Sequence, residues 1–200
     1  VAAFKSAGIE CPTAIAQVNL SRDAELNRRV AKQGAVNAAL LVAADGGDFV
    51  GVLRALEAGA NINATSFRGQ FHLAVERSTA LVLATRAKHR EVALALIERG
   101  ADVNLETGRA WGAPETPLRL AACHGDVDLC KRLLAQGADV QPKKKIYGIL
   151  WFVGLRAEKV TPKRLVAVIR LLLAAGAPVP EMRHRGALLE RATRAGDAHR

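Results

Sequence analysis

The side chains with the clearest capacity for chemistry are two cysteines and a histidine that lie close together in the sequence. Cys123, His124 and Cys130 are residue types that bind zinc. Adjacent side chains on a helix do not face the same direction, so Cys123 and His124 would diverge. No second pair of Cys or His completes a tetrahedral site. We therefore expect structural cysteines and no metal.

Motifs that mark the common catalytic sites are missing from the sequence. It contains no phosphate loop of the form GxxxxGK[ST], no dinucleotide fingerprint GxGxxG, no GxSxG elbow and no HExxH zinc motif. His72 falls in a connection that we expect to be exposed. We predict no catalytic residue and no cofactor, and hence a protein that is not an enzyme.

The charge of the chain is concentrated at one end. The 200 residues carry a formal net charge of +10, and 50% of them are hydrophobic. Residues 1–140 hold 16 basic and 15 acidic side chains, whereas residues 141–200 hold 13 basic and 4 acidic ones. The longest clean apolar run, 146–155, is shorter than the roughly 20 residues of a transmembrane helix. The composition predicts a folded protein with one basic surface and no transmembrane segment.

An internal repeat organises most of the chain. Four segments share an apolar helical stripe followed by Gly-Ala, a polar residue or proline, and an aliphatic residue: LRALEAGANIN (53–63), LALIERGADVN (94–104), RLLAQGADVQ (132–141) and RLLLAAGAPVP (170–180). Their glycines, Gly59, Gly100, Gly137 and Gly176, are spaced 41, 37 and 39 residues apart. In the first three, a turn residue lies 12 positions earlier, at Gly47, Lys88 and Gly125. The constant interval predicts a constant helix-turn-helix core.

The repeat resembles that of the ankyrin family, whose unit of about 33 residues carries T-P-L-H-x-A, a turn and a G-A-D-V-N ending. Here the third unit reads TPLRLAACHGD from Thr116, with Thr116 placed to cap a helix and Pro117 in its first turn. The resemblance implies an all-α fold, an ankyrin-repeat α-solenoid of stacked helix-turn-helix units with hairpin-like fingers. It also implies that His89 bonds neighbouring backbone in a turn.

We predict one ankyrin-repeat domain over residues 1–200. Residues 1–37 form a divergent N-terminal capping unit, in which 26–37 resembles a second helix; repeats follow at 38–63, 64–104, 105–141 and 142–180; and 181–200 is a half repeat. An uncapped repeat leaves its apolar face in water, so either the half repeat is the C-terminal cap or a partner covers that end.

The connections between repeats are longer than the family unit. The spacings exceed about 33 residues by 8, 4 and 6, and the excess falls in the fingers. Large or planar side chains in these segments are candidate partner-binding residues: Phe67, Arg68, Phe71, Arg109, Trp111 and Tyr147. The aromatic ones could instead fold back over a neighbouring loop. Polar residues at the finger bases, Asn61, Asn63, Asp102, Asn104 and Asp139, are expected to hydrogen-bond within turns.

Basic residues of the C-terminal third are candidates for binding an anion or an acidic partner: Lys143, Lys144, Lys145, Arg183, Arg185, Arg191 and Arg194. The segment 143–153 joins three lysines to an aromatic and aliphatic patch, which is also typical of a peripheral membrane contact. We favour burial of this patch as an inner helix, because a solenoid helix must cover its stripe with both neighbours.

These features predict a non-catalytic protein-protein interaction module, an adaptor or a structural subunit of a larger complex. It would bind through the enlarged fingers and the basic C-terminal third. The alternative is an RNA- or DNA-contacting subunit of a large, possibly organellar, ribonucleoprotein assembly. An effector that mimics a scaffold would share the same fold. Three irregularly spaced cysteines and no secretory hydrophobic region at the N-terminus predict an intracellular, reducing compartment: cytoplasm, nucleus or organelle interior.

Overall fold

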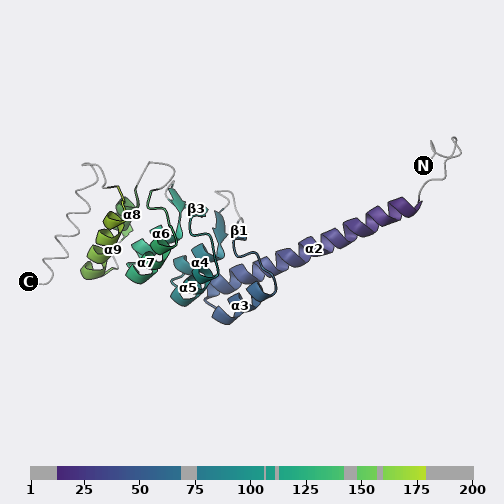
Figure 1. Ribbon diagram of the computed structural model, residues 1–200, viewed down its shortest axis with the longest axis horizontal. Helices are drawn as coiled ribbons and strands as arrows, with labels where there is room; N and C mark the ends of the chain where they lie inside the picture. The colour runs from purple at the N-terminus through teal and green to yellow at the C-terminus, as the bar shows by residue number, and fades with distance from the viewer. Residues whose placement is uncertain are drawn as a thin grey trace, which may run out of the picture.

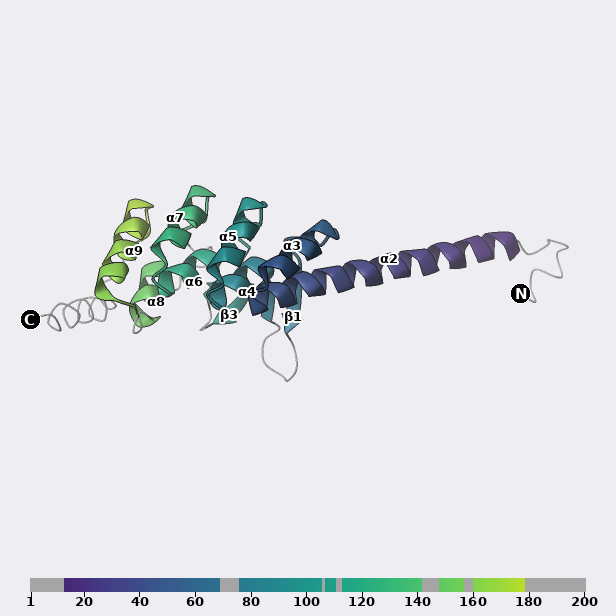
Figure 2. The same cartoon turned by 90° about the horizontal axis from the view of Figure 1, so that it is seen from below.

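Pairs of antiparallel helices stack along one axis in the computed structural model, which describes residues 13–68, 76–105, 107–110, 113–141, 148–156 and 160–178 (Figure 1). The pairs are α2 (Thr13–Gly46) with α3 (Phe49–Glu57), α4 (Ala80–Arg86) with α5 (Arg90–Glu98), α6 (Pro117–Cys123) with α7 (Val127–Ala135), and α8 (Ile149–Arg156) with α9 (Pro162–Ala174). Figure 2 shows α3, α5, α7 and α9 as one row, with the strands on the opposite side. The predicted all-α solenoid is confirmed.

The turn positions inferred from spacing adopt the conformation that ends a helix. Gly59, Gly100, Gly137 and Gly176 have φ between 79° and 88°, and Gly47 and Gly125 have φ of 74° and 70°. Lys88 occupies the same place in the second repeat, at φ 66°, although a side chain makes the left-handed region costly. The constant interval of 12 residues therefore reflects a constant turn-to-turn geometry.

Helix starts are fixed by side-chain caps. Asp48, Thr79, Thr116 and Asp126 each accept a hydrogen bond from the backbone N–H three residues later, at 2.8 to 3.3 Å. Pro117 follows the Thr116 cap at the first position of α6, where its missing N–H leaves no intrahelical bond unmade. The predicted role of Thr116 and Pro117 is confirmed.

In the part of the chain that the structure describes, the first two enlarged connections each form an antiparallel hairpin. Strand β1 (Thr65–Arg68) pairs with β2 (Glu76–Thr79), and β3 (Thr107–Ala110) pairs with β4 (Ala113–Glu115), with a register shift between Thr107 and Arg109. The two hairpins lie side by side through β2 and β3 (Figure 1). We call them the first and the second finger; both match the expected hairpin-like form.

The core is a continuous layer between the inner and outer helices. In α4, every residue from Ala80 to Thr85 is buried, because α2 packs on one side and α6 on the other. The most deeply buried leucines come from all the pairs: Leu40, Leu81, Leu96, Leu118, Leu133 and Leu172. Since every repeat buries its stripe against its neighbours, no single repeat holds a core of its own.

At the N-terminus the structure corrects one expectation. The divergent capping unit predicted over 1–37 is not a helix-turn-helix in the described residues, because 13–46 form a single helix of 34 residues. Its first part projects away from the stack (Figure 2). Gly34, which corresponds in sequence to the helix-ending glycines, does not have a positive φ and is part of the helix. The boundary at residue 37 and the other unit boundaries stay predictions.

Helix α8 decides between the two interpretations of the aromatic patch. Ile149, Leu150, Phe152 and Val153 are at most 5% exposed, and α8 packs against α6. The part of the patch that the structure describes is thus buried as an inner helix, as we favoured. In the described residues, no helix combines the length and the apolar character needed to cross a membrane.

Candidate functional site

The structure locates some of the predicted partner-binding residues by their backbone. Phe67 and Arg68 belong to β1 and Arg109 belongs to β3, so the two neighbouring hairpins carry them on one edge of the solenoid. The other predicted residues lie outside the described part of the chain: Phe71, Trp111, Tyr147, Lys143, Lys144, Lys145, Arg183, Arg185, Arg191 and Arg194. We call the edge formed by strands β1 to β4 the finger edge. It is the predicted binding surface whose contacts the structure describes.

One arginine joins the bases of both fingers. Arg86, at the end of α4, donates through Nη2 to Ser78 Oγ on β2 at 3.3 Å and to Glu115 Oε2 on β4 at 2.5 Å. Ser78 is 2% exposed and Glu115 is 7% exposed. A charge-assisted hydrogen bond in such a setting is stronger than a neutral one. Arg86 consequently fixes the first finger to the second.

The contact continues into the inner helices of the next two repeats. Arg119 on α6 places Nη2 3.8 Å from Glu115 Oε1, and its guanidinium lies 4.4 Å from the centre of the Phe152 ring on α8. Trp151 meets Phe152 edge to face, with ring centres 4.9 Å apart. We call Ser78, Arg86, Glu115, Arg119 and Phe152 the finger-base network. Sequence reasoning missed it, because its members lie in three different repeats.

Polar residues at the finger bases form a second, regular system. In each of three repeats the side chain two residues after the glycine accepts from the N–H two residues further on: Asn61 from Asn63, Asp102 from Asn104, and Asp139 from Gln141, at 2.7 to 3.0 Å. The expected role of these residues in turns is confirmed.

The same residues also link one repeat to the next. Asn63 Oδ1 accepts from Asp102 N–H at 2.9 Å, and Asn104 Oδ1 accepts from Asp139 N–H at 2.8 Å. Asn104 Nδ2 further donates to Gly137 O at 2.9 Å. The result is a hydrogen-bonded ladder that fixes the spacing of the fingers.

Helix α2 supplies the first rung of this ladder. Asn37 Oδ1 accepts from Asn61 N–H at 2.8 Å, and Gln33 Nε2 donates to Gly59 O at 2.9 Å. A third bond at 3.0 Å joins Gln33 Nε2 to Asn37 Oδ1. Residues 33 and 37 thus make the contacts that a preceding finger would make. At the other end, Pro178 stands where Asp139 does and has no N–H to donate.

The turn edge, opposite the fingers, is held by polar contacts between repeats. His89 Nε2 donates to Asp45 O at 3.1 Å, in line with the turn role expected of this histidine. Arg90 Nη2 donates to Asp128 Oδ2 at 2.8 Å, and Asp126 lies 3.9 Å from its Nε. The bond to Asp128, followed by the charge of Asp126, raises the pKa of Arg90. A small hollow of about 210 Å³ opens beside Arg90 and Arg164.

The environment of Cys130 suppresses the reactivity of its thiol. Cys130 is fully buried, and burial, with smaller contributions from Asp126 and Cys123, raises its pKa to about 12. Its thiol therefore stays protonated at neutral pH and is a poor nucleophile. Neither Cys123 nor Cys130 is part of a disulfide, and no group of three metal-ligating side chains occurs among the described residues.

A stack of helix pairs with a rigid finger edge defines the class of helical repeat proteins that present a preformed surface. A comparison with protein families matches residues 40–144 to ankyrin repeats in three copies, and the chain belongs to the ankyrin repeat family. Members of this family generally mediate protein-protein interaction. The comparison with curated proteins gave no match.

Proposed function

We propose that this chain is a non-catalytic adaptor or structural subunit that binds a partner protein through its finger edge. The finger-base network is the observation that carries the proposal. Two enlarged hairpins lie beside each other, and one partly buried, charged contact holds both to the inner helices. Phe67, Arg68 and Arg109 are on the strands of these hairpins, where large and planar side chains can serve as interface anchors.

Fixing the fingers in advance favours tight binding. A surface that is already ordered loses less conformational freedom on docking, so more of the contact energy remains as affinity. The polar ladder and the finger-base network both restrict how one finger can move relative to the next. We infer that the two fingers act as one surface.

The proposal is tested by capturing partners from lysate with the intact chain and with Phe67→Ala and Trp111→Ala variants. Phe49→Ala is the matched control, since Phe49 is an aromatic residue, 39% exposed, on α3 in the row of outer helices. Loss of the same partner in both finger variants, with capture retained in the control, supports the finger edge. Equal capture by all variants overturns it.

A second candidate function is polyanion binding by the C-terminal third, as in a nucleic-acid-contacting subunit. Its support is α9, where Lys163, Arg164 and Arg170 are exposed on a helix that has no acidic residue. Replacing Lys143, Lys144 and Lys145 by glutamine should then reduce the salt dependence of RNA or heparin binding. If the chain binds neither RNA nor heparin at low salt, polyanion binding is excluded as its function. Cys123 and Cys130, which form no disulfide, suit a reducing compartment inside the cell.

A further inference from the structure

Helix α2 exposes an apolar ridge that nothing in the described chain covers. Leu26, Val30 and Val42 are 59%, 63% and 73% exposed, and Gly34 and Ala38 are exposed between them. The five residues are spaced four apart, from 26 to 42, and none carries a charge. Residues four apart form the ridges through which helices most often pack on one another.

The C-terminal half of this ridge corresponds to a packed surface in the later repeats. Val42 lies five residues before its turn residue, as Leu83 and Leu120 do in the second and third repeats. Leu83 and Leu120 are each 5% exposed, whereas Val42 is 73% exposed. Beside Val42, a groove of about 600 Å³ runs between α2 and the base of the first finger, lined by Gly34, Ala38, Leu41 and Ala64 among others. The repeat-to-repeat packing surface is thus open at this end.

The polar contacts at this end indicate what kind of element can fill the groove. A preceding repeat would bond Asn61 N–H and Gly59 O through its own finger, but Asn37 and Gln33 already make both bonds. The apolar lining of the groove, in contrast, is not covered by any of the described residues. The groove therefore fits a bare helix with an uncharged ridge better than it fits another complete repeat.

The chain itself carries such a helix in the projecting part of α2. We propose that two copies of this protein associate by crossing their α2 helices at Gly34, in an antiparallel, two-fold symmetric pair. The ridge is centred on Gly34, so Leu26 of each copy meets Val42 of the other, and Val30 meets Ala38. Ridges of this kind pack at a crossing angle of about 50°. Each copy fills the other's groove with the same residues, as a two-fold interface requires.

Gly34 fits this crossing point for an independent reason. A glycine inside a helix is less favourable than an alanine at the same position. A Cβ built on Gly34 has no atom of the described residues within 4 Å, so their packing does not require a glycine there. At a two-fold axis, by contrast, its missing side chain lets the two backbones approach closely.

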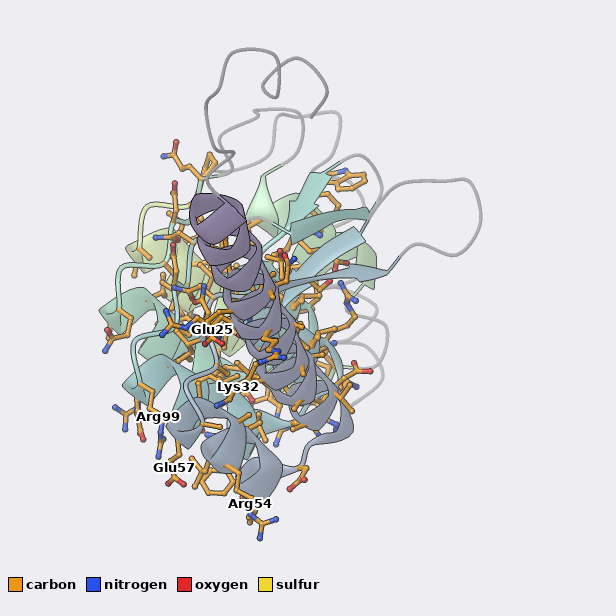
Figure 3. All side chains as sticks on the ribbon, turned by 90° about the vertical axis from the view of Figure 1, so that its right-hand side faces the viewer. Glu25, Lys32, Arg54, Glu57 and Arg99 are labelled. Atoms are coloured by element: carbon orange, nitrogen blue, oxygen red, sulfur yellow. The ribbon has the colours of Figure 1, made fainter. Side chains whose placement is uncertain are left out.

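The charges of α2 are compatible with the pairing. Glu25 and Arg29 form an ion pair of 3.4 Å, and both lie, with Lys32, more than a third of a turn away from Gly34 around the helix. Figure 3 shows Glu25 and Lys32 on the side of α2 away from the finger strands. Asp23 and Asp45 are each eleven residues from Gly34, where helices that cross at about 50° have already separated.

Sedimentation equilibrium of the intact chain, with and without Val30→Glu, tests the proposal. A dimer is expected, and the buried glutamate should raise its dissociation constant at least about tenfold. Val50→Glu is the matched control, because Val50 is an exposed valine, 52% accessible, on α3 outside the ridge. Circular dichroism of both variants establishes that each is folded.

Disulfide trapping locates the contact. The double variant Val30→Cys, Ala38→Cys should give a covalent dimer under mild oxidation, because residue 30 of each copy meets residue 38 of the other, whereas Arg29→Cys, on the far side of the helix, should not. A monomer at every concentration overturns the proposal. So does a dimer that is unaffected by Val30→Glu, one that the double variant does not trap, or one that Arg29→Cys traps as well as the double variant does. Capture experiments on the fingers are independent of these results, so the two proposals can fail separately.

Discussion

Glu115 Oε2 lies 2.5 Å from Arg86 Nη2, and this contact links the second finger to the inner helix of the preceding repeat. Glu115 is almost fully buried, and Arg119 approaches its other carboxylate oxygen. A buried carboxylate between two arginines is tolerated because its charge is balanced on both sides. The stability of the finger edge therefore depends on Glu115 more than on any exposed residue of the hairpins.

Replacing Glu115 by glutamine should lower the free energy of unfolding by about 2 kcal/mol, because the buried guanidinium of Arg119 loses its counter-charge. Urea denaturation measures the change. Glu91→Gln, on the exposed part of α5, should stay within about 0.5 kcal/mol of the unaltered chain. Equal effects of the two substitutions would contradict a structural role for the network.

Removing the side chain of Asn104 should cost about 1 to 2 kcal/mol, since two hydrogen bonds between repeats are lost together. Asn104→Asp keeps the acceptor for Asp139 N–H and loses the donor to Gly137 O, so it should cost less than Asn104→Ala. Asn27→Ala, at an exposed position of α2, is the control. The ordering of the three variants in thermal or chemical denaturation checks the ladder.

The buried thiol of Cys130 should make stability depend on pH at the alkaline end. Its pKa is raised from 9.0 to about 12 in the folded chain, so the unfolded chain gives up this proton first as the pH rises. The contribution is complete below pH 9 and is lost between pH 9 and 12, at up to about 1.4 kcal/mol per pH unit.

The comparison that isolates this effect is Cys130→Ala. Alanine is tolerated at the equivalent position of α5, where Ala93 is fully buried. The unaltered chain should lose stability more steeply than Cys130→Ala above pH 9, as measured by denaturation at a series of pH values. Parallel pH profiles would show that Cys130 does not titrate with unfolding.

Two substitutions at turn residues should act in opposite directions. Lys88→Gly should stabilise the chain by about 1 kcal/mol, because Lys88 has a φ of 66° that glycine adopts without strain. Gly47→Ala should destabilise it by at least about 1 kcal/mol, since φ is 74° and a Cβ there would overlap the ring of His89. Thermal melts of the two variants should move to either side of the parent; a shift in the same direction would refute the shared turn geometry.

Features that depend on neighbouring residues in the sequence could be predicted. The intervals between Gly59, Gly100, Gly137 and Gly176 located the ends of the outer helices, and Thr116 with Pro117 marked the start of an inner one. These signals are local, because a left-handed residue or a helix cap is decided within one turn.

The finger-base network could not be predicted in the same way. Arg86 and Glu115 are 29 residues apart, and nothing in their immediate surroundings shows that they pair. The single long helix at the N-terminus could not be predicted for a different reason. Its GAVN ending, 34–37, resembles the close of a repeat, but with no finger to follow, the helix continues through Gly34 to Gly46. Asn37 nevertheless keeps the hydrogen bond that its place in the motif implies.

Pro178 interrupts the hydrogen-bonded ladder between the third and fourth units. A repeat inserted between the second and third units would find an asparagine to donate to and an N–H to receive, so the module can be duplicated there. Between the third and fourth units the donor position is Pro178, which has no N–H to offer the side chain at 141, so this rung of the ladder is missing. For engineering, this makes the middle of the chain the place to lengthen the solenoid, and Pro178→Asp the change that supplies an N–H between the third and fourth units.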